Sequence, residues 1–252
     1  MNDEKQIMDE LIEKFKNISS RGWIESNRSH NTGIGKTFED LLEKEEDNRA
    51  EPDYTAIEIK THRSESNSYT TLFTCAPDGP EPQENSRLRE KFGQPDKELG
   101  QKTLHTSMWG NRANSYFNKY KFKLDVDRTE EKVYIAVYDN EDNLIERTTY
   151  WTFDKLYSCL ERKLRTLAFV TGKSRTNDKN KEEFLYEKLV LYKFKTLDGF
   201  LTSIENGTIM VDLRIGFYKS GNKFGKAHDH GTGFRIKDSH LQDLYELICQ
   251  IP

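Results

Sequence analysis

One short stretch of the sequence constrains the fold more than any other. Residues 55–62, TAIEIKTH, alternate apolar and polar side chains, and this alternation predicts a β-strand. Successive side chains of a strand point to opposite faces, so Ile57 and Ile59 would enter a core. Glu58 and Lys60 would then project together from the other face. The stretch therefore predicts a sheet strand with one buried face and one polar face.

Patterns elsewhere predict a chain in which strands and helices alternate. Further strands are predicted at residues 70–76, 121–127, 132–138, 148–153, 167–171, 210–218 and 231–236, the first beside 55–62 and the last two as a hairpin. Helices are predicted at residues 4–18, 37–47, 153–164 and 239–248, the second with Thr37 as its N-cap. Residues 77–100 hold four of the six prolines and predict a long surface loop, and residues 184–195 fit either element. The expected fold class is mixed, α/β or α+β.

Composition excludes several classes of protein. The chain of 252 residues is 34% hydrophobic and 33% charged, but its 12% of aromatic residues speaks against disorder. No stretch approaches the roughly 20 apolar residues that span a bilayer, and the acidic, amphipathic N-terminus is unlike a secretory signal. We therefore expect a soluble cytoplasmic protein without a membrane partner. Cys75, Cys159 and Cys249 are too scattered for a disulfide framework or a zinc motif, so reduced, mostly interior thiols are expected.

Charge is distributed unevenly along the chain. The formal net charge of −4 speaks at first against a nucleic-acid partner. Ten basic and five acidic residues, however, give residues 161–195 a net charge of +5. Six basic residues against one acid give residues 214–237 the same +5. Such a separation suits a protein with one surface that faces DNA, although charge runs often form only a solvated face.

The most informative pattern combines Asp53 with Glu58 and Lys60. Asp53, preceded by a proline, could fold back from the head of the strand to share a Mg²⁺ ion with Glu58, because this cation prefers oxygen ligands. Lys60 could orient the attacking water in phosphodiester hydrolysis, and Glu39 on the preceding helix could complete a second metal site. Mn²⁺ is expected to substitute. The alternative is a half-buried strand whose polar face is merely solvated. A phosphate loop at NTGIGKT is disfavoured because the spacing of that motif is absent.

Several segments together resemble one family. TGIGKTFEDLL, PD…IEIKTH and DLRIG…KAHDHGTGFR resemble the MvaI/BcnI family of type II restriction endonucleases, in the MutH-like branch of the PD-(D/E)xK nucleases, and most closely its MvaI members. The resemblance implies a mixed sheet flanked by helices and two lobes that form a DNA-binding cleft. It also implies that Asp53, Glu58 and Lys60 are the catalytic triad and that Glu39 is the helix carboxylate preceding it. Members are monomers, and the MvaI type implies CC(A/T)GG as the target.

A second cluster of polar residues suits the reading of a GC-rich site. Arginine can pair with guanine O6 and N7, and aspartate can accept from the amino group of cytosine. The positions that contribute to base reading in the resembled family match Arg214, His228, Asp229, His230 and Arg235. His62, two residues past Lys60, could contact the scissile phosphate or be structural. Two alternatives for the histidine pair are transition-metal binding and the bracing of a hairpin turn.

These observations predict a prokaryotic type II restriction endonuclease acting on double-stranded DNA as a monomer. Residues 1–120 are expected to form a catalytic lobe and residues 121–252 a recognition lobe, with a boundary that is approximate and lobes that can interleave. A DNA methyltransferase is expected in the same system, without physical association. The rivals are a strand-nicking repair endonuclease of the MutH type and a catalytically silent, sequence-specific DNA-binding protein.

Overall fold

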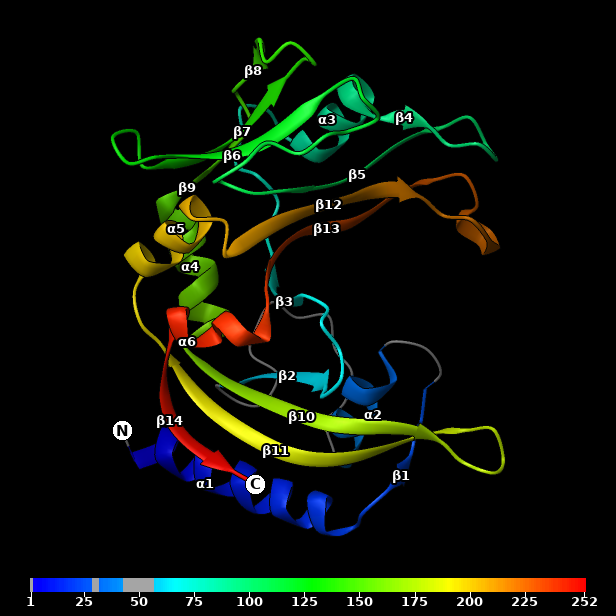
Figure 1. Cartoon of the computed structure of the whole chain (residues 1–252), viewed down its shortest axis with the longest axis vertical. Coiled ribbons are helices and arrows are strands. Elements are labelled where there is room, and N and C mark those ends of the chain that lie inside the picture. The colour runs from blue at the N-terminus through cyan, green and yellow to red at the C-terminus, as the bar shows by residue number, and fades with distance from the viewer. Residues whose placement is uncertain (1, 29–31, 43–56) are drawn as a thin grey trace. The chain divides into compact units, whose positions relative to one another are not determined.

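The computed structural model describes residues 2–28, 32–42 and 57–252, apart from the side chains of residues 2, 3, 227 and 230 (Figure 1). Contacts divide the chain into two units. Unit 1 comprises Met1–Thr70, Leu160–Lys195 and Tyr245–Pro252, and unit 2 comprises Thr71–Cys159 and Thr196–Leu244. The segments interleave along the chain, so the units do not follow a single boundary near residue 120. Within both units helices and strands are mixed, as the sequence predicts.

Unit 1 is organised around one sheet, which has five strands among the described residues. Its order is β1 (Ile24–Glu25), β11 (Glu182–Phe194), β10 (Thr166–Thr176) and β2 (Glu58–Arg63), with β14 (Tyr245–Ile251) also paired to β11. The strand β2 runs parallel to β10, and the other pairs are antiparallel. Figure 1 shows α1 (Asn2–Ser20) lying along this sheet. None of the described helices has the length and apolar character needed to cross a membrane.

One face of this sheet is covered by α1 and α2 (Gly33–Leu41). Leu11, Phe15 and Ile18 recur at helical spacing on α1 and are buried, so the predicted helix at 4–18 is confirmed. The start of α2 was predicted wrongly. Thr37 lies within the helix, fully buried, and its hydroxyl accepts a hydrogen bond from the backbone N–H of Asn27 at 3.1 Å. Residues 43–47 of the predicted helix lie outside the described residues.

Unit 2 contains two further sheets among its described residues. The first has the order β3 (Thr70–Thr74), β13 (Ala227–Ile236), β12 (Ile209–Phe217), β5 (Lys102–Met108) and β4 (Gln94–Pro95). The second has the order β6 (Lys121–Asp127), β7 (Lys132–Tyr138) and β8 (Leu144–Glu146), with β9 (Tyr150–Thr152) also on β7. The remaining elements are α3 (Glu84–Phe92), α4 (Phe153–Leu164), α5 (Leu197–Glu205), α6 (Leu241–Leu244), η1 (Gly221–Lys223) and η2 (Asp238–His240).

Aromatic side chains form the centre of the core in unit 2. The rings of Phe73 and Phe234 are stacked with centroids 4.8 Å apart, and Trp151 meets Phe234 edge-on at 5.4 Å. The indole N–H of Trp151 donates to the carbonyl of Cys75 at 2.9 Å, so the buried ring keeps a hydrogen bond. The thiols of Cys75 and Cys159 are buried as expected and lie 3.4 Å apart, while Cys249 is half-buried.

Three predictions of elements require correction. The strand β3 does not lie beside β2; it pairs with β13, and the neighbour of β2 is β10. Residues 77–100 are not one loop, because α3 forms there around the buried Leu88 and Phe92. The last predicted helix ends at Leu244, after which β14 pairs with the edge of β11. By contrast, the predictions at 121–127, 132–138 and 153–164 coincide with β6, β7 and α4, and residues 184–195 fall on β11.

Candidate functional site

Glu58 and Lys60 lie on the face of β2 that is turned away from α1 and α2. The intervening Ile57 and Ile59 are buried in the cluster formed with those helices, which directs Glu58 and Lys60 to the opposite side. Glu58 is only 2% exposed, and the ammonium of Lys60 donates a hydrogen bond to its carboxylate. The structure therefore brings this predicted pair together in a sheltered place, where a charge interacts more strongly than in water.

Apolar neighbours shelter this pair on the same sheet. In the register of β10 with β2, Leu167 stands beside Glu58 and Phe169 beside Lys60. The side chains of aligned strand residues point to the same face, so the apolar side chains of Leu167 and Phe169 lie next to the two charged groups. The parallel pairing with β10 thus supplies the low-polarity surroundings that an isolated alternating strand would lack.

His62 continues the polar face of β2. Its ring lies 6.2 Å from that of Phe169, and its Nε2 atom is 2.9 Å from the hydroxyl of Ser68. The next residues in the same row of the sheet are Thr171 of β10 and Lys188 of β11. The row His62–Thr171–Lys188 therefore extends the polar face beyond Lys60 with groups that can meet a phosphate.

Glu39 lies on α2, which closely approaches β2. A Cβ atom on Gly35, one turn before Glu39, would lie 3.0 Å from the hydroxyl of Thr61. Glu39 is half-buried, and its neighbour Asp40 pairs with Lys36 at 2.9 Å. The hydrogen bond from Lys36, with another from Asn27, holds the pKa of Asp40 below its ordinary value. Asp40 is thus engaged on the helix, and the role of Glu39 as a metal ligand stays a prediction, because α2 packs on the face of β2 opposite to Glu58 and Lys60.

The donor chemistry of this region suits a hard divalent cation. The carboxylate oxygens of Glu58 are of the type that Mg²⁺ prefers. No group of three or more His, Cys, Asp or Glu side chains placed to hold a metal is found among the described residues. Asp53, the other carboxylate of the predicted site, lies outside those residues, so the complete set of ligands stays a prediction.

Arg214 and Arg235 meet on the first sheet of unit 2 at a carboxylate that the sequence analysis missed. Asp212 of β12 is 3% exposed, and it accepts hydrogen bonds from Nε of Arg214 at 2.8 Å and Nη1 of Arg235 at 2.9 Å. The spacing of Asp212 and Arg214 on an otherwise apolar strand, IMVDLRIGF, was the available signal. These two predicted arginines are therefore brought together.

His228 and Asp229 are neighbours in sequence but have different surroundings. The ring of His228 lies 4.1 Å from that of Tyr218 and lines a hollow of about 440 Å³ with His105 and other residues. Asp229 instead accepts from Asn85 of α3 at 2.7 Å and from the backbone N–H of Gly231 at 2.8 Å, where φ is +82°. Asp229 thus stabilises the backbone of β13 where its pairing with β12 is irregular, so it has a structural role beside any role in base reading. The side chain of His230 lies outside the described residues.

His105 is adjacent to the arginine cluster in the register of β5 with β12, where it stands beside Arg214. Burial lowers the pKa of His105, and the nearby charge of Arg214 lowers it further. The imidazole is therefore held in its neutral form near pH 7, in which one ring nitrogen accepts and the other donates a hydrogen bond.

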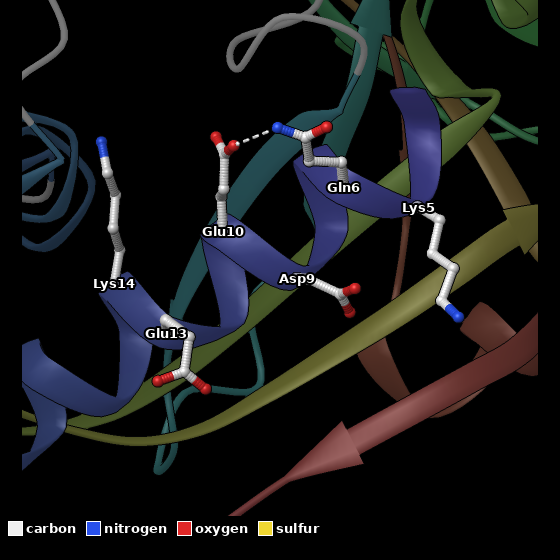
Figure 2. Close-up of a pocket in the computed structure, with 6 residues that line it drawn as sticks. All are labelled: Lys5, Gln6, Asp9, Glu10, Glu13 and Lys14. Carbon is white, nitrogen blue, oxygen red and sulfur yellow. Dashed lines mark hydrogen bonds between the residues drawn. The ribbon is translucent and has the colours of Figure 1, made fainter. Parts of the chain in front are cut away.

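The outer face of α1 has a different character. Figure 2 shows six polar side chains that line a shallow hollow there, with Gln6 donating to Glu10 at 3.1 Å: Lys5, Gln6, Asp9, Glu10, Glu13 and Lys14. Three carboxylates against two ammonium groups give this face an excess of negative charge. Such a face disfavours a polyanion, so it is distinct from the polar face of β2.

Comparison with known proteins identifies the family. The sequence model described as the MvaI/BcnI restriction endonuclease family matches residues 12–245. The chain belongs to this family. A solved structure of the restriction endonuclease MvaI with its cognate DNA substrate has 42% sequence identity and a TM-score of 0.89, and the match covers 95% of this chain and 96% of that one. A structure of MvaI in the absence of DNA has 42% identity, covers 95% of each chain and has a TM-score of 0.63. No curated protein is matched.

Membership of the MvaI/BcnI family makes the protein a type II site-specific endonuclease, as the sequence predicted. Restriction endonucleases generally use divalent metal ions, which is consistent with the oxygen donors near β2. In this MvaI/BcnI endonuclease the predicted site residues fall into two groups within the described residues. Unit 1 holds Glu39, Glu58, Lys60 and His62, and unit 2 holds Arg214, His228, Asp229 and Arg235.

Proposed function

We propose that this MvaI/BcnI-family endonuclease hydrolyses double-stranded DNA at CC(A/T)GG with Mg²⁺ held by Asp53, Glu58 and Glu39. The observation that carries the proposal is the ion pair of Lys60 with the buried Glu58 on one face of β2. A carboxylate that is fixed beside an ammonium group in apolar surroundings can hold a cation while the ammonium faces a phosphate. The family membership and the similarity to MvaI bound to its cognate DNA support DNA as the substrate.

The side chains of unit 1 divide the chemistry between them. A bound Mg²⁺, which Mn²⁺ can replace, supplies charge neutralisation at the phosphate and lowers the pKa of a coordinated water. Lys60 orients the attacking water and stabilises the charge that develops on the phosphoryl oxygens. The water oxygen bonds to phosphorus, the bond from phosphorus to the 3′ oxygen breaks, and that oxygen takes up a proton. The products carry a 5′-phosphate and a 3′-hydroxyl, and His62 is assigned to the scissile phosphate.

Unit 2 is assigned the reading of the bases, and unit 1 the cleavage. Arg214 and Arg235, on the first sheet of unit 2, are suited to guanine, because a guanidinium can bond to O6 and N7 together. The residues assigned to base reading are Arg214, His228, Asp229, His230 and Arg235. The enzyme acts as a cytoplasmic monomer that cuts the two strands in successive nicks, and a separate methyltransferase protects the host DNA.

The test is cleavage of an unmethylated plasmid carrying CCAGG and CCTGG sites, with Mg²⁺ and with sequencing of the product ends. Asp53→Ala is the inactive variant, and Asp9→Ala on the outer face of α1 is its matched control. The expected result is a set of discrete cuts within CC(A/T)GG, which Asp53→Ala loses and Asp9→Ala keeps. A nicked circle should appear before the linear product, because each binding event cuts one strand.

The other outcomes separate the rivals. Discrete cuts at a different sequence would retain the endonuclease and remove the proposed target. Nicks that never become double-strand breaks would favour the MutH type of strand-nicking enzyme. If folded protein binds CC(A/T)GG but does not cut it with Mg²⁺ or Mn²⁺, the protein is a binding protein that has kept the fold.

A further inference from the structure

The carboxylate of Asp212 lies at the junction of two predicted base-reading arginines. Its Oδ2 atom accepts from Nε of Arg214 at 2.8 Å and from Nη1 of Arg235 at 2.9 Å. Its Oδ1 atom accepts from the hydroxyl of Ser107 at 2.8 Å. The residue as a whole is only 3% exposed, and both oxygens of its side chain are already engaged by donors from three strands. Asp212 is therefore not available to read a base itself.

The register of the sheet explains why these groups meet. Arg214 lies two residues beyond Asp212 on β12, so both side chains point to the same face. Arg235 on β13 is aligned with Met210, which is two residues before Asp212 on β12, so it reaches the carboxylate diagonally. Ser107 on β5 is aligned directly with Asp212 from the other side. The carboxylate thus belongs to the middle strand of three, β12, and accepts hydrogen bonds from both neighbouring strands, β5 and β13.

The two arginines differ in how far they reach outwards. The side chain of Arg214 is 52% exposed and that of Arg235 is 24% exposed, against 4% for Asp212. The bond from Arg214 uses Nε, which leaves its two terminal nitrogens for an acceptor in a DNA groove. A guanidinium whose plane is fixed in advance loses less freedom on binding a guanine edge than one that rotates freely.

We propose that Asp212 is a positioning residue for DNA recognition, which holds the guanidinium groups of Arg214 and Arg235 side by side as one preorganised unit for reading guanines. This inference rests on the proposed function of unit 2 in base reading. Both guanidinium groups bond to the same oxygen, Oδ2 of Asp212, so they converge although their backbones are four residues out of register, and such a pair suits two successive guanines, which stack about 3.4 Å apart. The reading of a GG step would then depend on a residue that touches no base.

The test measures binding and specificity rather than cleavage. Fluorescence anisotropy without divalent metal gives the affinity for a duplex containing CCAGG. The same measurement is made on duplexes in which one or the other G·C base pair of the GG step is replaced by an A·T base pair. In Asp212→Asn, the volume is kept but the charge that holds both arginines is removed. We expect cognate affinity to fall roughly tenfold to a hundredfold, the range of one or two good arginine–guanine contacts. Affinity for the substituted duplexes should stay the same or rise, since one negative charge has gone.

The matched control is Glu98→Gln, which removes one negative charge from the same unit. Glu98 is exposed and pairs with Lys219 at 3.2 Å, so its loss should change cognate and substituted duplexes alike. The proposal would be overturned if Asp212→Asn discriminated between cognate and substituted duplexes as well as wild type does. It would also be overturned if the variant lost affinity equally for all duplexes, because that result indicates a structural role only. Wild-type protein that fails to discriminate at all would instead refute the proposed function of the unit.

A second measurement keeps the proposal testable if Asp212→Asn does not fold. Arg214→Ala, Arg235→Ala and the double variant form a cycle of cognate affinities. If one carboxylate organises both arginines, the double variant should lose clearly less than the product of the two single losses, by about fivefold or more. Losses that simply multiply would mean that the arginines act independently and would overturn the role of Asp212.

Discussion

The ammonium of Lys60 is bonded to the carboxylate of Glu58, two residues earlier on β2, and that carboxylate is almost wholly buried. The pair stands beside Leu167 and Phe169 of the parallel strand β10. Removal of either partner would leave the other charge poorly compensated in apolar surroundings. Each partner therefore yields a separate prediction.

Lys60→Met retains most of the aliphatic stem and removes the charge. We expect the rate of single-turnover cleavage to fall by roughly 10²- to 10⁴-fold, the usual contribution of a group that acts on the attacking water or the developing charge. Binding of a cognate duplex without metal should change less than about threefold. The measurement is a quenched-flow time course at saturating protein. Cleavage within a factor of about three of wild type would remove Lys60 from the chemistry.

Glu58→Gln keeps the shape of the side chain but weakens it as a ligand. We expect the Mg²⁺ concentration for half-maximal cleavage to rise by more than about tenfold, because even residues that only support a ligand change metal affinity by that amount. Glu39→Gln is the companion variant on α2, and it should show a comparable rise if Glu39 holds a second ion. An unchanged Mg²⁺ dependence in Glu39→Gln would limit the site to Asp53 and Glu58.

Lys188 is expected to contribute to the phosphate-facing row of unit 1. It is aligned through Thr171 with His62 in the sheet. Lys188→Ala should weaken binding to every duplex by a similar factor and reduce the slope of log affinity against log salt by about 1. The control is Lys5→Ala on the acidic outer face of α1 (Figure 2), where no effect is expected. Equal salt slopes for wild type and Lys188→Ala would show that this lysine contacts no phosphate.

Glu146 should make unit 2 sensitive to acid. Burial raises the pKa of Glu146, but hydrogen bonds and charges from Arg87 and Lys91 outweigh burial and lower the pKa to about 2, from 4.5. Because the folded-state pKa is lower than the unfolded one, the stabilisation is complete above about pH 4.5 and is lost as pH falls towards 2. A shift of this size corresponds to at most about 3 kcal/mol.

The corresponding variant is Glu146→Gln, studied by urea unfolding at several pH values. It should be less stable than wild type near neutral pH, and this deficit should shrink steadily between about pH 5 and about pH 3. Glu90→Gln is a suitable control, because Glu90 is exposed and pairs only with Arg89 among the ion pairs of the described residues. A deficit that stays constant across this range would show that Glu146 stabilises by packing rather than by charge.

Local periodicity was enough to predict a large part of the fold. The strands β6 and β7 and the helix α4 begin and end where their patterns do, because each repeats a period of two or 3.6 residues over its whole length. The same period of two predicted that Glu58 and Lys60 share a face. The family resemblance then added residue roles that periodicity cannot supply. The comparison confirmed the family, while the roles stay predictions.

Contacts between distant segments decided the rest. The sequence predicted a helix over residues 239–248, yet the chain from Tyr245 onwards is a strand because the edge of β11 satisfies its backbone hydrogen bonds. α3 was missed because its few apolar residues are supplemented by buried polar ones, such as Glu84, whose carboxylate is satisfied by Arg87. A sequence pattern reports only which way a side chain points along its own element. The meeting of Asp212 with Arg214, Arg235 and Ser107 was decided by the tertiary structure, because the register between β5, β12 and β13 depends on the burial of all three strands together.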